Sequence, residues 1–304
     1  MNLRASSHII ATVLAFAAFA FPAQAEKIGP GHSAMWIDPD RNGEGWIVEI
    51  LPDDNAALYW YTWDEEGKPR WIISLGEIVH SEDDNHDRIV FSELLTGHGG
   101  RFAPGIPPED VTLDVVGTAE IEFSDCNAGQ IAFEAYGVSR TYPLTRLTHT
   151  LEAGCSATPP PEGDPESLIR PDPGTSGTWF DPESQGGPVF TLQWLADGGA
   201  ILFWFAYDAE GNPFWAAGLG HLEGDLLVFP QLDYVSGGRF GEDYPPEEAE
   251  LIPWGQLVMT VSCDTAHVEY EATAEGFDAG SFQLTPLTRL LKPGCPFWTP
   301  PTTD

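Results

Sequence analysis

The sequence predicts an all-β protein built from two tandem antiparallel barrels, and three observations support this prediction. Most of the chain repeats itself in order, apolar residues alternate in short runs bounded by Gly, Asp or Asn, and no segment keeps a helical period. Counting these runs gives about eight strands in each copy with mostly short connections, which favours a meandering barrel over a Greek-key sandwich.

The duplication is visible as a series of collinear matches along the chain. The matched pairs are residues 36–39 with 179–182, 60–71 with 204–215, 99–102 with 237–240, 107–109 with 245–247, and 144–147 with 287–290. The third pair is Gly-Gly-Arg-Phe in both copies, and the last pair is Leu-Thr-Arg-Leu. Because the matches keep the same order, we interpret the chain as two copies of one module.

The first residues have the features of a secretory signal peptide. Arg4 is their only charged residue, residues 9–21 are apolar, and Ala23 and Ala25 frame the expected cleavage site. No later run approaches the about 18 consecutive apolar residues of a membrane-spanning helix, so we expect a secreted or periplasmic protein without a membrane span. The expected divisions are 1–25 (signal peptide), 26–155 (first barrel module), 156–175 (Pro-rich linker), 176–298 (second barrel module) and 299–304 (tail).

The cysteines are even in number, in a chain that is expected to reach an oxidising compartment where disulfides persist. One pair lies near the end of each copy. Of the possible connectivities we therefore expect Cys126–Cys155 and Cys263–Cys295.

The chain is strongly acidic, with 47 acidic and 13 basic residues and a net charge of −34. Nucleic acid is not an expected partner, because the basic surface that phosphates require is missing. Anionic membrane surfaces are disfavoured for the same reason. The expected partner is a small molecule, a glycan or a protein of cationic, neutral-polar or apolar character.

The second copy resembles the calycin-type barrels, the structural group of lipocalins, avidins and periplasmic metalloproteinase inhibitors. The resemblance is carried by Gly-Thr-Trp at 177–179, the meander of strands and Arg289 near the end. It implies that Trp179 closes the barrel floor with Arg289 packed across it, and that Trp36 and Arg146 do so in the first copy. The first copy lacks the Gly of this motif.

The whole mature chain also resembles a group of modules that occur in tandem in secreted proteins of Gram-negative bacteria. Their pattern, Trp-aromatic-Asp-Pro followed by Trp-Tyr-x-Tyr-Asp-x-x-Gly-x-Pro-x-Trp, matches residues 36–39 and 60–71 and their repeats. This resemblance implies export and a duplicated architecture, and it leaves activity open.

Two segments of the first copy have the composition of metal sites. Asp38, Asp40, Asn42 and Glu49 fit the calcium-loop pattern Asp-x-Asp-x-Asn-Gly-x5-Glu, whose oxygens could coordinate Ca²⁺. The alternative is a polar Asp-Pro turn that enters a strand, since the second copy does not keep the pattern. Residues 80–87 combine histidine with carboxylates and could bind Zn²⁺ or Ni²⁺, the alternative being a solvated loop.

The aromatic runs at 59–63 and 203–207 are apolar on both faces, although a strand of a solvated barrel should alternate with polar residues. The second face must be covered by the other barrel, by long loops or by a ligand. The predicted ligand-site residues are Trp60, Trp63, Trp71 and Arg101 in the first copy and Trp204, Tyr207, Trp215 and Arg239 in the second. The two arginines could bind an anionic group or neutralise nearby carboxylates.

These observations favour an exported, non-enzymatic binding or interaction protein. One alternative is a secreted hydrolase that uses recurring carboxylates, which are Asp38, Asp64, Asp181 and Asp208. The resemblance to calycin-type barrels suggests a periplasmic protease inhibitor as another alternative. The recurring carboxylates lie beside Gly and Pro, where acidic residues commonly cap turns, so the sequence leaves enzymatic activity undecided.

Overall fold

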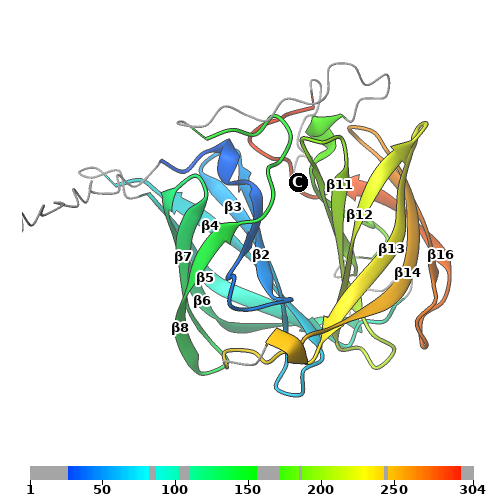
Figure 1. Ribbon diagram of the computed structural model, residues 1–304, viewed down its shortest axis with the longest axis horizontal. Helices are drawn as coiled ribbons and strands as arrows, with labels where there is room; N and C mark the ends of the chain where they lie inside the picture. Colours follow the sequence, from blue (N-terminus) through cyan, green and yellow to red (C-terminus); the bar gives the residue numbers. More distant parts are fainter. Residues whose placement is uncertain are drawn as a thin grey trace, which may run out of the picture.

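The computed structural model consists of two closed antiparallel barrels that lie side by side (Figure 1). Each barrel has its strands in chain order, which confirms the predicted pair of meander barrels. The structure describes residues 27–81, 87–102, 110–155, 172–184, 187–242 and 246–295. The predicted signal peptide, the tail and most of the linker lie outside these residues.

The first barrel closes when its last strand pairs with its first, in the register Trp36 opposite Arg146. A short 3₁₀ turn, η1 (Pro30–His32), precedes it. Its strands are β1 (Ala34–Ile37), β2 (Gly45–Leu51), β3 (Asn55–Trp63), β4 (Pro69–Val79), β5 (Arg88–His98), β6 (Thr112–Asp125), β7 (Ala128–Ala135) and β8 (Val138–Arg146).

The second barrel closes in the same way, with Pro286 of its last strand opposite Trp179 of its first. Two 3₁₀ turns belong to it, η3 (Pro173–Thr175) and η4 (Pro246–Glu248). Its strands are β9 (Gly177–Phe180), β10 (Val189–Trp194), β11 (Ala200–Tyr207), β12 (Pro213–Glu223), β13 (Leu226–Ser236), β14 (Glu250–Val261), β15 (Ala266–Ala272) and β16 (Gly280–Pro286). Among the described residues there is no helix with the length and apolarity needed to cross a membrane.

Alternate residues of each strand fill the barrel interiors, because successive side chains of a strand project to opposite faces. In β3 the inward side chains include Leu58 and Trp60. In β11 they include Leu202 and Trp204. The largest interior side chains are Trp36, Trp46 and Trp60 in the first barrel and Trp179, Trp194, Trp204 and Trp254 in the second.

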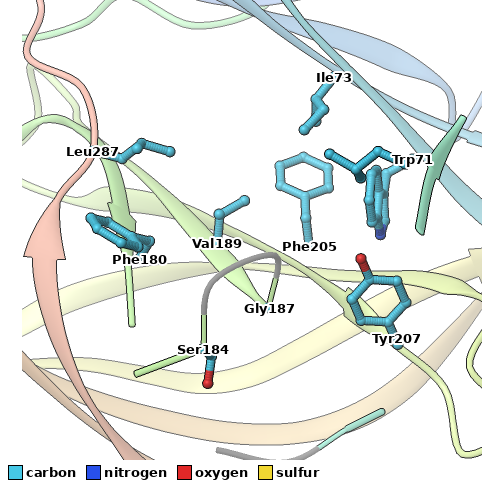
Figure 2. A pocket seen from close by; sticks show the side chains of 10 residues that line it. Trp71, Ile73, Phe180, Ser184, Gly187, Val189, Phe205, Tyr207 and Leu287 are labelled. Atoms are coloured by element: carbon cyan, nitrogen blue, oxygen red, sulfur yellow. The ribbon is translucent and has the colours of Figure 1, made fainter. Parts of the chain in front are cut away.

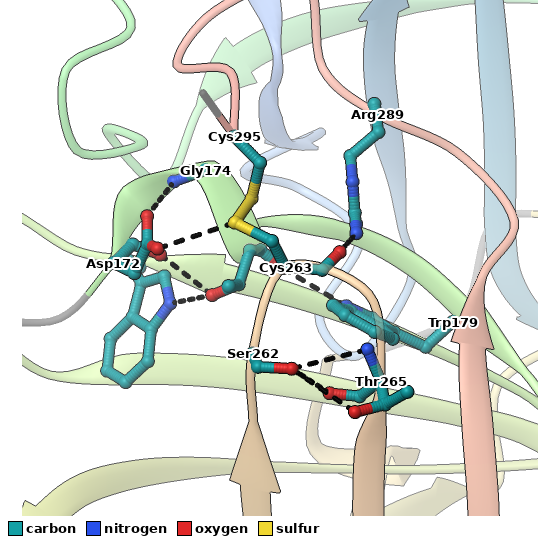
Figure 3. The surroundings of a disulfide bond; sticks show 10 residues. Asp172, Gly174, Trp179, Ser262, Cys263, Thr265, Arg289 and Cys295 are labelled. Carbon is teal, nitrogen blue, oxygen red and sulfur yellow. Dashed lines mark hydrogen bonds between the residues drawn. A yellow bond between two sulfur atoms is a disulfide. The ribbon is translucent and has the colours of Figure 1, made fainter. Parts of the chain in front are cut away.

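One end of each barrel is closed by a tryptophan, an arginine and a disulfide. The guanidinium carbon of Arg289 lies 4.7 Å from the centroid of the Trp179 ring, and Arg289 donates a hydrogen bond to the carbonyl oxygen of Cys263. Figure 3 shows these groups beside the Cys263–Cys295 disulfide. The predicted pairing of cysteines is therefore confirmed here, and Cys126–Cys155 confirms it in the first barrel.

Arg146 and Arg289, which cover Trp36 and Trp179, come from different positions of the repeat. The predicted alignment of the two Leu-Thr-Arg-Leu segments is therefore wrong. The amide of Leu147 donates to the carbonyl oxygen of Met35, and the amide of Leu287 donates to that of Thr178, so Leu147 and Leu287 are equivalent. Arg146 precedes its leucine, whereas Arg289 follows its leucine after one intervening residue. The predicted alignment is thus shifted by three residues. Arg146 nevertheless takes the predicted place over Trp36, with its guanidinium carbon 5.7 Å from the ring centroid.

The outward faces of β3 and β11 pack against each other. Tyr59 stacks on Phe205 with ring centroids 5.7 Å apart, and Tyr61 lies 4.6 Å from Phe203. These rings belong to a buried apolar cluster shared by both barrels. Packing of one barrel on the other, which the sequence left as one of three possible covers, explains why both strands are apolar on both faces.

Equivalent tryptophans cross the contact in both directions. The indole nitrogen of Trp71 in β4 donates to the carbonyl oxygen of Ala206 in β11 at 2.7 Å. The indole nitrogen of Trp215 in β12 donates to the carbonyl oxygen of Thr62 in β3 at 3.1 Å. Because each indole N–H finds a carbonyl on the other barrel, burial of these rings leaves no polar atom unpaired at this point.

The Gly-Gly-Arg-Phe segments exchange a phenylalanine between the barrels. Phe102 of the first copy enters the core of the second barrel, where its ring lies 4.9 Å from Trp204 and 4.8 Å from Phe277. Phe240 of the second copy enters the core of the first barrel and lies 5.2 Å from Trp60. Each barrel core is therefore completed by the other barrel.

The glycines of these segments are required by close packing. A Cβ atom on Gly238 would lie 2.4 Å from the ring of Trp63, and one on Gly100 would lie 2.3 Å from the ring of Tyr207. Gly237 in addition has φ of +97°, a conformation that side chains disfavour. The recurrence of Gly-Gly-Arg-Phe thus has a structural cause.

Replacing Phe240 by alanine is expected to destabilise the first barrel, although Phe240 belongs to the second. The loss should be about 3 kcal/mol, because a buried aromatic ring is removed and a cavity remains. Amide hydrogen exchange should therefore quicken in β1–β8 more than in β9–β16. Leu226→Ala, at an exposed position of β13, is the matched control. Faster exchange confined to β9–β16 would contradict the exchange of core residues.

Candidate functional site

Two apolar grooves flank the contact between the barrels. The Trp71 groove has a volume of about 290 Å³, and residues that line it include Trp71, Ile73, Leu113, Phe205, Tyr207 and Leu287. The Trp215 groove has a volume of about 440 Å³, and residues that line it include Tyr61, Phe203, Trp215, Leu219, Asp233 and Leu251. Figure 2 shows Trp71 and Ile73 from the first barrel facing Phe205 and Tyr207 from the second.

The grooves occupy equivalent places in the duplicated structure. Trp71 and Trp215 are each the third residue of their strand, β4 and β12. Leu113 and Leu251 are each the second residue of theirs, β6 and β14. The duplication thus produces one groove on each side of the contact.

Large apolar side chains stand open to solvent along both grooves. Leu113 is 48% exposed and Leu287 is 51% exposed at the Trp71 groove. Leu219 is 64% exposed and Leu251 is 61% exposed at the Trp215 groove. Exposed leucines that gather at a hollow are typical of binding surfaces, whereas single exposed leucines need no explanation.

The predicted ligand-site residues are divided between three environments. Trp60 and Trp204 lie inside the barrels. Trp63 is buried in the contact, where its indole nitrogen donates to the carbonyl oxygen of Val235 at 2.9 Å. Trp71, Tyr207 and Trp215 are buried in the same contact and also line the grooves.

The two predicted arginines lie at the surface. Arg239 is half exposed and forms an ion pair with Glu248 at 3.5 Å, as expected if it neutralises a nearby carboxylate. Arg101 is exposed. Neither residue is among those that line the two grooves.

Among the described residues, the carboxylates of the predicted calcium loop, Asp38, Asp40 and Glu49, do not gather within 4.8 Å of one another. Asp38 caps its own turn, with its carboxylate accepting the amide of Asp40 at 3.0 Å, and Asn42 is exposed. Glu49 lies on β2, and its carboxylate bonds to Thr178 and Thr288 of the second barrel. The pattern therefore builds a turn that leads into a strand and contributes one carboxylate to the interface.

In the described part of the chain, one group of three His, Cys, Asp or Glu residues has its potential metal-ligand atoms within 4.8 Å of one another. The group consists of Asp172, Cys263 and Cys295. The two sulfurs are bonded to each other, so they offer no thiolate to a metal. Of the predicted histidine-rich tract, residues 82–86 lie outside the described residues. His80 contacts Asp87 at 3.0 Å and Asp54 at 3.2 Å, and the hydrogen bond with Asp54 is the main cause of its raised pKa.

The recurring carboxylates of the hairpin turns are used as caps. Asp64 accepts the amides of Glu66 and Lys68 at 2.8 and 2.9 Å. Asp208 accepts the amide of Asn212 in the same way at 2.8 Å. Hydrogen bonds to the turn amides account for the recurrence of these residues.

Glu49 links the two barrels by hydrogen bonds. Its two carboxylate oxygens accept the hydroxyls of Thr178 at 2.8 Å and Thr288 at 2.5 Å, both from the second barrel. Burial raises the pKa of Glu49 to about 7, while the hydroxyls and the charge of Arg289 act in the opposite direction. On the other side of the contact Gln193 takes the equivalent place and accepts the hydroxyl of Thr148 at 2.9 Å.

A buried ion pair that the sequence did not reveal anchors the second barrel to the first. Glu44 accepts hydrogen bonds from Arg41 at 2.5 Å, Thr62 at 2.6 Å and Trp60 at 3.0 Å. Arg41 also donates to the carbonyl oxygen of Glu242, in the loop that follows Phe240. The second copy has no basic residue in the corresponding segment, so the repeat gives no sign of this pair.

Comparison with known protein families and with curated proteins finds no match to this chain.

Glu49→Gln is expected to stabilise the protein above pH 7. The pKa of Glu49 is raised from 4.5 in the unfolded chain to about 7 in the folded protein. Its contribution to stability is therefore fully present below pH 4.5 and is lost as the pH rises through 7. The free energy of unfolding falls by about 3 kcal/mol through this loss, and a glutamine, which stays neutral, does not cause it.

Thermal unfolding of the wild type and of Glu49→Gln at pH 4.5 and at pH 8 measures this effect. Glu77→Gln, at an exposed position of β4, makes the same change of charge and serves as the control. A difference between wild type and Glu49→Gln that is the same at both pH values would rule out the raised pKa.

Proposed function

We propose that this chain is an exported, non-enzymatic binding protein whose ligand sites are the Trp71 groove and the Trp215 groove. The observation that carries the proposal is the pair of apolar grooves at equivalent places, each bordered by leucines that are about half exposed or more. Such surface costs free energy in water, and an apolar ligand or partner would remove it from solvent.

The grooves are better candidates than the barrel interiors. Trp60 in the first barrel and Trp204 in the second each lie against the phenylalanine that enters from the other barrel. The side chains of the protein itself therefore take the aromatic environment that an interior ligand would need.

The uses of the recurring carboxylates also favour binding over hydrolysis. Asp64 and Asp208 are hydrogen-bonded to the amides of their own turns, and no shared polar centre recurs in the grooves. Export is supported by the signal-peptide features of residues 1–25 and by the two disulfides, which persist in oxidising compartments.

A neutral apolar dye, N-phenyl-1-naphthylamine, tests the proposal on the mature chain. We expect the fluorescence titration to show two sites. The double variant Leu113→Gln with Leu287→Gln should weaken one site about tenfold, and Leu219→Gln with Leu251→Gln should weaken the other equally, because apolar contact area is lost.

Leu226→Gln is the control for this titration, since Leu226 is exposed but lines neither groove. Affinity that is the same in the wild type and in both double variants would reject the grooves as binding sites.

A further inference from the structure

We propose that the Trp215 groove binds an organic cation that carries an apolar body, with Asp233 as the counter-charge. This inference rests on the proposed binding function and names the class of ligand for one of the two grooves.

Asp233 is the charged residue among those that line this groove, and apart from its neighbour Gln231 the large side chains around it are apolar or aromatic. It lies on β13 opposite Ala217 of β12 and is half buried. Its carboxylate accepts the side-chain amide of Gln231 at 2.6 Å. Within the described ranges no Lys, Arg or His forms an ion pair with it. A carboxylate beside apolar surface that forms no ion pair within the protein favours a cationic ligand.

Aromatic rings line the same groove. Tyr61 lies 5.2 Å from Trp215 and 4.6 Å from Phe203 between ring centroids. The rings are almost fully buried, so they provide an electron-rich apolar floor and do not form an open cage. Aromatic faces attract ammonium and guanidinium groups, and this attraction adds to that of the carboxylate.

Leu219 and Leu251 stand at the solvent edge of the groove. Their side chains offer an apolar contact to whatever is attached to the cation. A ligand that matches both features is an amphiphile with one positive head and a hydrocarbon or aromatic body.

The Trp71 groove lacks the carboxylate and serves as an internal comparison. Asp233 pairs with Ala217 across β12 and β13, and in the first barrel Leu95 pairs with Ile73 across β4 and β5. Leu95 therefore occupies the position of Asp233. The two grooves share their apolar character, and the Trp215 groove alone has a charge at this position.

The charge of the whole chain works in the same direction. A net charge of −34 attracts cations from solution and repels anions, and it acts on the rate at which a ligand arrives. The choice of groove, in contrast, depends on the single charge of Asp233 because both grooves share the overall field.

Isothermal titration of the mature chain with decyltrimethylammonium and with decyl maltoside, each below its micelle concentration, tests the proposal. We expect the Trp215 groove to bind the cation about tenfold more tightly than the neutral detergent. Asp233→Asn should remove this preference. Asp225→Asn, which removes an exposed charge from the turn between β12 and β13, should leave it unchanged.

The outcomes separate this inference from the proposed function. Equal losses with Asp233→Asn and Asp225→Asn would overturn the inference, because the preference would then come from the overall charge. Equal affinity of the wild type for both detergents would overturn it as well, while the proposed function would stand. Failure of both detergents to bind would reject the proposed function itself.

Discussion

The packing of the outward face of β3 against the outward face of β11 is the constraint on which the rest of the structure depends. Each strand presents aromatic rings on both sides, and a single barrel would leave one set in water. The two barrels bury these sets against each other. Burial is favourable here because Trp71 and Trp215 donate to carbonyl oxygens across the contact, so these two indole nitrogens keep partners.

Further contacts follow from this one. Once the strands face each other, the hairpin turns come close enough for the amide of Gly237 to bond the carbonyl oxygen of Gly67, and for Gly99 to bond Gly211 in the same way. The residues that follow these glycines place Phe102 in the core of the second barrel and Phe240 in the core of the first. Neither barrel has a complete core without the other, so the duplicated module functions structurally as a pair.

The grooves are a geometric result of the same packing. Two rounded barrels that touch along a pair of strands leave a hollow on each side of the contact, and the duplication makes the hollows equivalent. The two copies differ at a few equivalent positions around this contact. Glu49 of the first copy corresponds to Gln193 of the second, and Leu95 of the first corresponds to Asp233 of the second. Such differences give two similar sites separate electrostatic character.

The sequence by itself determined the strand content, the duplication and the pairing of cysteines, because alternation and repetition are local or nearly local properties. It also revealed that the second face of the aromatic strands needs a cover. Only the tertiary structure decided that the other barrel provides it, that Trp60 lies inside while Trp63 lies in the contact, and that the grooves hold Leu113 and Asp233. These outcomes depend on the register and on the relative placement of two distant copies, which no pattern within one copy records.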